Sequence, residues 1–333
     1  MNRPLLAIAL MAVAVCAQPQ SLHIGFIDFY GYAGIDLDAI RARLPIHEGD
    51  QVTEDQMEKL IDRIKHTADA TGVNAVCCDD QRRLMFYIGL RGRSARDVPY
   101  NPVPHGDARL PAAVTELDRQ FVAAVTAAVS AGRSAEDQSK GYALSADPAA
   151  RSKQMAMRRY AVDHERLIQR VLQSSGDADH RAIAARLMGY ARQSREQIGA
   201  LVQASHDPDE EVRNNATRAL WVLAASGSKP ASWIPAAGFI EMLYSRSWTD
   251  RNKSLILLEV LTRGRDPKLL SALRAQALPP LLEIARWHNF GHAGGARMIL
   301  GRCAGIEEHR LEKLAAAGEV DVILAALQAR PGR

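Results

Sequence analysis

Residues 207–220 read Asp-Pro-Asp-Glu-Glu-Val-Arg-Asn-Asn-Ala-Thr-Arg-Ala-Leu, a pattern typical of the start of an amphipathic helix. Asp207 is expected to cap a helix, because its carboxylate can accept unpaired amides of the first turn and Pro208 needs no amide donor there. Glu210 completes the cap and complements the positive helix end. The helix then carries a single apolar stripe that must be buried, formed by Val212, Ala216, Leu220 and Leu223.

The same pattern recurs at spacings typical of helical repeats. Residues 171–179 and 201–209 match in register at an offset of 30. Related sets recur at Arg181, Ala184, Leu187 and Met188, at Arg251, Ser254, Leu257 and Leu258, and at Ala296, Ile299 and Leu300. Partner helices are expected at 196–204, 236–244 and 280–287, and further capped starts at Asp147-Pro148 and Asp266-Pro267. Helix pairs that cannot bury their faces alone stack into an α-solenoid.

These residues resemble the HEAT repeat family of armadillo-type α-solenoids. The match is sharpest at 207–223 and becomes weaker over the rest of 145–330, where Gly294 and Gly295 fall inside the fourth expected helix. The resemblance implies an all-α array that presents a concave face to a protein partner. Bilin-lyase relatives imply an alternative, a small-molecule binder or lyase-like enzyme that uses a solenoid groove.

Residues 22–92 predict a small α+β domain. Strands are expected at 22–29, 74–78 and 84–90, a short helix at 37–44 that Asp36 caps, and a longer helix that Thr53 opens and Gly72 closes. This β-α-α-β-β order resembles a POTRA domain, on the residues Ile27-Asp28-Phe29-Tyr30-Gly31, the Gly49 turn and the last strand Met85-Phe86-Tyr87-Ile88.

The POTRA resemblance implies binding of partner polypeptides, often by adding a strand to an open sheet edge. It leaves open a role as an outer-membrane assembly or secretion accessory that acts through this domain. The strand pattern stops after residue 92, which departs from the usual context of that family. A small α+β domain without a transport link is the alternative.

Residues 93–111 predict a linker, because proline and glycine in polar surroundings sustain neither helix nor sheet. A helix at 111–131 is expected to cover the first repeat, followed by a polar loop as far as Ser145. The array extends over 112–330 and is expected to close with an apolar helix around 320–327.

Residues 1–17 predict a cleaved signal peptide. Arg3 precedes an apolar run, and Val15-Cys16-Ala17 resembles a cleavage site. The run is too short to span a bilayer, which disfavours an uncleaved anchor, and Val15 stands where a lipoprotein needs a smaller residue. We therefore expect a periplasmic or secreted protein without stable membrane insertion.

Cleavage leaves Cys77, Cys78 and Cys303, an odd number for an oxidising compartment. Adjacent cysteines in a strand point to opposite faces, so we expect these side chains to act as small apolar residues. A disulfide between Cys303 and one of the pair stays open as the alternative.

Composition excludes several classes of protein. The 333 residues are 47% hydrophobic and 24% charged, ordinary values for a globular chain of about two domains. A net charge of +4 and 5% aromatic residues do not favour a nucleic-acid partner. The charge is uneven, at −3 for residues 18–110 and +6 for residues 111–333, which favours an acidic partner or docking between the two parts.

No constellation of residues predicts catalysis, a cofactor or a metal. His288 and His292 are four apart but enclose no glutamate base, and Ser205-His206-Asp207 lists triad residue types only by adjacency. The glycine-rich run 291–296 lacks the preceding strand and the lysine of a phosphate loop. Arg181, Arg213 and Arg251 predict a ladder that pairs with neighbouring aspartates, with an anion-binding groove as the alternative.

The sequence therefore predicts an exported, non-enzymatic scaffold of the cell envelope that binds a protein partner on the concave face of its array.

Overall fold

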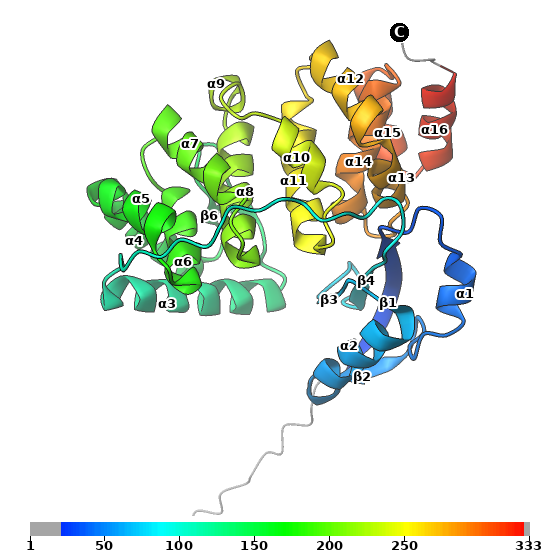
Figure 1. Ribbon diagram of the computed structural model, residues 1–333, viewed down its shortest axis with the longest axis horizontal. Coiled ribbons are helices and arrows are strands. Elements are labelled where there is room, and N and C mark those ends of the chain that lie inside the picture. The colour runs from blue at the N-terminus through cyan, green and yellow to red at the C-terminus, as the bar shows by residue number, and fades with distance from the viewer. Residues whose placement is uncertain (1–20, 330–333) are drawn as a thin grey trace, which may run out of the picture.

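Helix pairs stacked in series form the larger part of the chain, and a small sheet lies against the C-terminal half of the stack (Figure 1). The computed structural model describes residues 21–329. The predicted signal peptide at 1–17, with Cys16, lies outside the described residues. Across residues 21–329, no helix has both the length and the apolar character needed to cross a membrane.

Each pair has an outer helix and an inner helix, and the inner helices pack against one another in order. The outer helices are α5 (Glu165–Ser174), α7 (Arg195–Ala204), α10 (Ala237–Met242) and α13 (Leu278–Ala285). The inner helices are α6 (Ala178–Met188), α8 (Glu210–Ala225), α11 (Trp248–Leu261) and α14 (Phe290–Cys303). The rest are α4 (Pro148–Asp163), α9 (Ser228–Ala231), α12 (Pro267–Gln276), α15 (Glu308–Ala316) and α16 (Val320–Gln328). The predicted helical repeat array is confirmed.

Helix α8 forms within the segment that begins at Asp207, as predicted, but the residue that caps it is Asp209. This carboxylate accepts the amide hydrogens of Glu211 and Val212 at 3.0 and 3.1 Å. The prediction that Asp207 caps the helix is wrong, because the guanidinium of Arg181 holds both oxygens of that carboxylate. The predicted stripe is confirmed, since at most 1% of each side chain is exposed at Val212, Ala216, Leu220 and Leu223.

The other predicted starts are confirmed, since Asp147 caps α4 and Asp266 caps α12, each directly before a proline. The fourth inner helix runs unbroken through Gly294 and Gly295. A Cβ at Gly295 would lie 3.2 Å from Cγ of Leu255 on α11. The glycine therefore allows close approach of two neighbouring inner helices.

The N-terminal sheet has the strand order β2-β1-β4-β3. Its strands are β1 (Ser21–Tyr30), β2 (Gln51–Thr53), β3 (Gly72–Val76) and β4 (Leu84–Gly89), with β1 parallel to β4 and the other pairs antiparallel. Two helices, α1 (Leu37–Arg41) and α2 (Glu54–Ala68), complete the domain. The short β2 adds an element to the predicted β-α-α-β-β order, and the POTRA-like assignment stays a prediction.

Two local predictions about α2 are wrong. Thr53 precedes the helix, but its side chain makes no capping hydrogen bond. The helix ends at Asp69, whose φ of 49° is left-handed, and Gly72 begins β3. The last turn is closed by the backbone amide of Asp69 itself, which bonds to carbonyls within α2.

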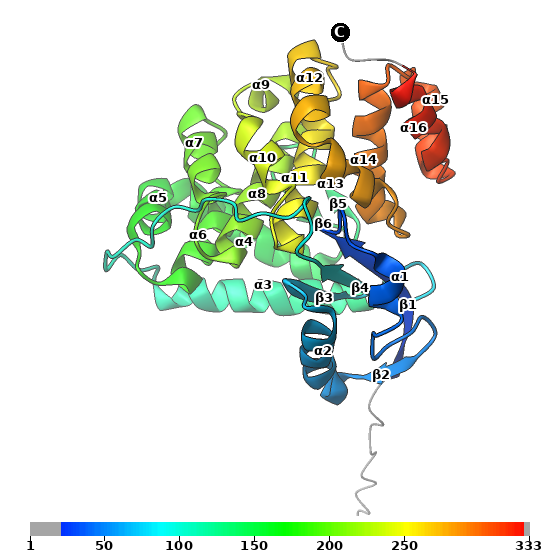
Figure 2. The ribbon, with the colours of Figure 1, turned by 45° about the vertical axis from the view of Figure 1, so that its right-hand side comes forward.

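The sheet is buried on both faces. Along β4, Phe86 and Ile88 belong to the core that the sheet shares with α2, whereas Met85 and Tyr87 belong to the core of the array. Successive side chains of a strand point to opposite faces, so the array acts as the second layer over this sheet (Figure 2).

The segment that joins the sheet to the array has no regular secondary structure and is held in place by its contacts with the array. Residues 93–111 contain no helix or named strand, as predicted, yet they run along the array (Figure 1). They lead into α3 (Ala112–Ser130), which confirms the predicted helix, and then into a short hairpin of β5 (Glu136–Asp137) and β6 (Leu144–Ser145).

Cys77 and Cys78 form a disulfide, and Cys303 on α14 is free. The expectation that the adjacent cysteines point to opposite faces is wrong, because β3 ends at Val76 and strand alternation does not extend to them.

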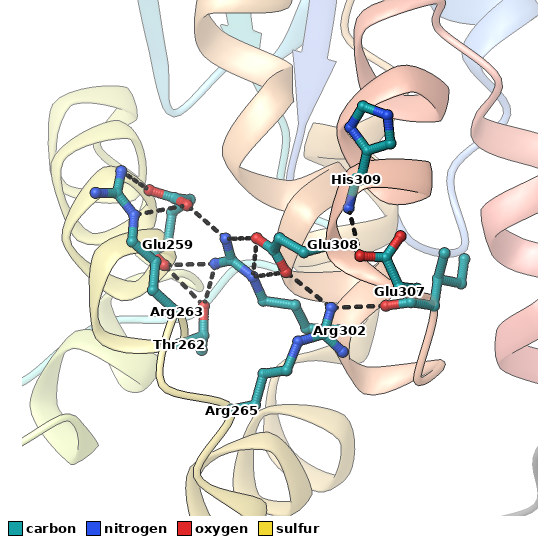
Figure 3. A network of polar contacts seen from close by, with 9 residues as sticks. Glu259, Thr262, Arg263, Arg265, Arg302, Glu307, Glu308 and His309 are labelled. Atoms are coloured by element: carbon teal, nitrogen blue, oxygen red, sulfur yellow. Dashed lines mark hydrogen bonds and ion pairs between the residues drawn. The ribbon is translucent and has the colours of Figure 1, made fainter.

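An ion-pair network joins α15, near the C-terminal end, to α11 and α14 of the array (Figure 3). The buried guanidinium of Arg302 on α14 lies 2.9 Å from Glu259 of α11 and 2.6 Å from Glu308 of α15. Arg265 reaches the same Glu308 at 2.7 Å. Three helices are therefore tied together through a single buried arginine.

Candidate functional site

Three arginines occupy the same position of successive inner helices, Arg181 on α6, Arg213 on α8 and Arg251 on α11. At most 4% of each residue is exposed. Each guanidinium donates to the carbonyl oxygen six residues earlier, which belongs to Ser175 at 3.0 Å, Asp207 at 2.9 Å and Ser245 at 2.6 Å. The three arginines thereby fix the turn that precedes each inner helix.

Each arginine also faces a carboxylate of the next repeat. Arg181 holds Asp207 through two bonds of 2.8 and 2.9 Å, and Arg213 holds Asp250 at 2.8 Å. Arg251 lies 3.7 Å from Glu283. The predicted ladder is confirmed for the two aspartates, and its third acid is a glutamate. Because these guanidinium groups are buried and paired, they offer no open groove to an anion.

Residues 93–110, which we call the strap, bond to the turns that the ladder fixes. The backbone N–H of Arg96 donates to Tyr244 O at 3.0 Å, that of Asn101 to His206 O at 2.7 Å, and that of Gly106 to Ser174 O at 2.7 Å. The three acceptors each lie seven residues before a ladder arginine. The strap therefore meets equivalent positions of three repeats in steps of five residues.

Tyr100 is the strap's main side-chain anchor. The Arg213 guanidinium lies 3.9 Å from the centre of its ring, and its hydroxyl donates to Asp250 at 2.7 Å. Burial, together with the charge of Asp250, raises the pKa of Tyr100 to about 12, so the hydroxyl keeps its proton. Both groups that hold Tyr100 belong to one ion pair of the ladder.

The sheet is joined to the array through buried Glu283 of α13. Its carboxylate accepts the backbone amides of Gly31 at 2.8 Å and Tyr32 at 2.9 Å, as well as the hydroxyl of Ser94. Burial raises the pKa of Glu283 despite these partners. Arg251 completes the junction by donating to Ser94 O at 2.7 Å.

The structure separates the two histidines that lie four apart in sequence. His288 precedes α14 and bonds through Nδ1 to buried Asp28 at 2.8 Å, whereas His292 lies within α14 and bonds to the Tyr87 hydroxyl at 2.5 Å. The bond to Asp28 raises the pKa of His288, and burial lowers the pKa of His292 to about 4. Both histidines serve the contact between sheet and array.

The lowered pKa of His292 predicts that the contact between sheet and array loses stability in acid. His292 is ordinarily neutral only above about 6.5, so its contribution to stability is lost as the pH falls from there through about 4. At pH 4 the loss relative to pH 7 is about 3 kcal/mol for this group. His288 acts in the opposite sense, since its contribution is complete below its unfolded pKa and declines as the pH rises through its raised folded value.

Urea unfolding at pH 7 and pH 4 measures this effect. Wild type should lose about 3 kcal/mol more than the His292→Asn variant between the two pH values. The His288→Asn variant is the matched control, and its loss on acidification should be no smaller than that of wild type. Equal losses for wild type and His292→Asn would contradict the assignment.

The remaining sequence candidates form no reactive site. Ser205 Oγ lies 3.2 Å from His206 Nδ1, but Asp207 is bound to Arg181 and completes no triad. The glycine-rich run 291–296 forms the first turns of α14. In the described part of the chain, no three His, Cys, Asp or Glu side chains gather as metal ligands would.

A pocket of about 220 Å³ opens between α3 and the inner helices α6 and α8, a surface that we call the inner face. Phe121, Val122 and Val125 of α3 form its apolar wall, and Arg186 and Arg218 stand opposite. Val122 is 42% exposed, and Val129, which lies about two turns further along the same side of α3, is 45% exposed. Sequence periodicity predicted α3 but not that its apolar side would stay partly open.

The sheet offers an unpaired edge at β3, the last strand in the order β2-β1-β4-β3. A groove of about 420 Å³ lies beside this edge, lined by Gly72, Val73 and Asn74 of the strand and by Arg96 and Arg246. An open edge of this kind can pair with another extended chain.

The chain matches no protein-family model, and no curated protein matches it. Solved structures similar to it include an engineered protein at 15% identity, with 65% of this chain and 98% of that chain covered and a TM-score of 0.39. A computationally designed armadillo repeat protein for modular peptide recognition has 15% identity, 66% and 93% coverage and a TM-score of 0.39. A designed armadillo repeat protein in complex with the peptide (KR)4 has 13% identity, 58% and 91% coverage and a TM-score of 0.38. The peptides named for these structures belong to those designed proteins.

Proposed function

We propose that the protein is an exported, non-enzymatic scaffold of the cell envelope that holds a protein partner on the inner face of its helical array. The observation that carries this proposal is the pocket between α3 and the inner helices. It combines a partly open apolar wall with a polar rim, the composition found in protein interfaces. Export rests on the sequence of residues 1–17.

The charged groups around the pocket are already paired, so they favour a partner segment that binds mainly through apolar side chains. Arg218 is paired with Glu136 at 2.5 Å, and Arg186 with Glu211 at 3.1 Å and with Asp118. These paired groups form a rim that is already neutralised, so burial of Val122 and Val125 supplies the main driving force. A partner helix or extended segment with an aliphatic or aromatic side chain fits this surface.

A photo-crosslinking amino acid at Val122 of the full-length protein, expressed in its own cells, tests the proposal. We expect a defined partner to be crosslinked from this position, and the exported chain to begin at Gln18. The matched control is Met155 of α4, which is 37% exposed outside the pocket lining. The proposal would be contradicted if every protein crosslinked from Val122 were also crosslinked from Met155, or if Val122 crosslinked no protein at all.

The open edge of β3 favours a second candidate, an outer-membrane assembly or secretion accessory that acts through the POTRA-like domain. An extended partner would add a strand beside residues 72–76 and fill the neighbouring groove. The same crosslinker at Asn74 distinguishes the two, because an assembly partner should be captured there and not from Val122.

A further inference from the structure

We propose that the turn edge of the array is a recognition track for an extended polypeptide, and that the strap occupies this track in cis. The track runs along the ends of the outer helices and the turns that lead into α6, α8 and α11, and its acceptors are the carbonyl oxygens of Ser174, His206 and Tyr244. It shares no lining residue with the inner-face pocket, so this inference stands independently of the proposed function. Its partner is an extended segment that carries the strap's own pattern of anchors.

The track repeats with the array, and the strap repeats with the track. Backbone amides at positions 96, 101 and 106 reach the three equivalent carbonyls in order, each at 2.7 to 3.0 Å. Main-chain bonds of this kind bind any extended chain of suitable spacing, and side-chain pockets then select the sequence. A connector that only joined two domains would not need one hydrogen bond for each repeat.

Four anchors select the sequence of the segment. Tyr100 fits between Arg213 and Asp250, and the side-chain amide of Asn101 donates to Gln203 O at 2.9 Å. Glycine is required at position 106, because a Cβ there would collide with the Ser174 carbonyl. The fourth anchor is Leu110, which is 4% exposed within the array core.

The middle of the strap leaves the track partly empty. A pocket of about 290 Å³ lies beneath Pro102, Val103 and Pro104, against Leu172 and Ala200. Val103 itself is 49% exposed. The strap therefore holds at its ends and leaves between them a partly open pocket with both polar and apolar lining, where a partner segment with a larger side chain gains contacts with Leu172 and Ala200.

Because the strap is part of the same chain as the track, it binds there in preference to a free peptide. A segment joined to its own site acts at an effective concentration of order mM, so a free peptide at μM concentration is excluded by roughly a thousandfold. Weakening the cis anchors should open the track, and that consequence can be measured.

The probe is a fluorescein-labelled synthetic peptide of residues 94–110, added to the mature full-length chain in an anisotropy titration. The wild type should bind it at least about a hundredfold more weakly than a Tyr100→Ala/Asn101→Ala variant. Gly106→Ala, which disturbs the strap at a different repeat, is a second opening variant. Val103→Ser is the matched control, since that side chain is half exposed, and it should exclude the peptide as wild type does.

The Tyr100→Ala version of the peptide should lose most of its binding to the opened variants. In wild type itself, about 1 mM unlabelled peptide should speed hydrogen exchange at the amides of Asn101 and Gly106, a measurement that needs no substitution. Equal binding by wild type and opened variants, equal binding of both peptides, or no effect on exchange would overturn the proposal. A dimer of the opened variants that excludes the peptide would also overturn it, in favour of strap exchange between two copies.

Discussion

Replacing Arg251 with alanine should lower the free energy of unfolding by about 3–5 kcal/mol. The residue is fully buried and binds the carbonyls of Ser245, Tyr244 and Ser94. Its removal takes a donor from each of these carbonyl oxygens in a water-poor interior, and it takes away the cation that lies 3.7 Å from the Glu283 carboxylate. Burial lowers the pKa of Arg251 only to about 10, so the side chain that is lost is charged at neutral pH.

Chemical unfolding of wild type and variant in urea measures the loss. Arg263→Ala is the matched control, because that side chain is 56% exposed and lies just past the end of α11, where its pair with Glu259 is worth less than about 1 kcal/mol. A Glu283→Gln variant and the double variant complete a cycle, in which the two losses should fail to add. A loss for Arg251→Ala as small as the control's would show that the junction between sheet and array does not depend on this arginine.

The parts of the fold that the sequence predicts correctly depend on local chemistry. Caps at Asp147 and Asp266 need only a carboxylate, a proline and the next turn, and the stripe through Val212 and Leu220 needs only helical spacing. Each of these features is contained within a few turns of chain. Such interactions keep the same meaning wherever the segment lies in the protein.

The parts that could not be predicted depend on residues far apart in the chain. The proline- and glycine-rich composition of 93–111 correctly excludes helix and sheet, but it carries no sign of the carbonyls 68 to 148 residues away that bind the strap. Glu283 is similar, since its amide donors at Gly31 and Tyr32 lie about 250 residues earlier. The one available signal was Arg181, Arg213 and Arg251 at repeat spacing, which indicated buried pairs without naming the strap that lies over them.

Asp207 and Asp209 provide the sharpest test of this distinction, because they are two residues apart and the sequence assigns the cap to the wrong one. Asp209→Ala should cost about 1 kcal/mol, the usual loss for a helix cap. Asp207→Ala should cost about 3–5 kcal/mol, because it strands the guanidinium of Arg181, which is 1% exposed. Asp207 also accepts the amide of Asp209 at 2.9 Å, which adds to its loss.

Urea midpoints for the two single variants decide between the assignments, and Asp207→Asn separates charge from shape. The amide keeps an acceptor for Arg181 but loses the ion pair, so its loss should fall between those of the two alanine variants. Pairing Asp207→Ala with Arg181→Met should recover part of the stability, since the buried charge is then removed with its partner. If Asp209→Ala is the more damaging single change, Asp207 acts as no more than a turn residue, and the arginine ladder does not hold the repeats together.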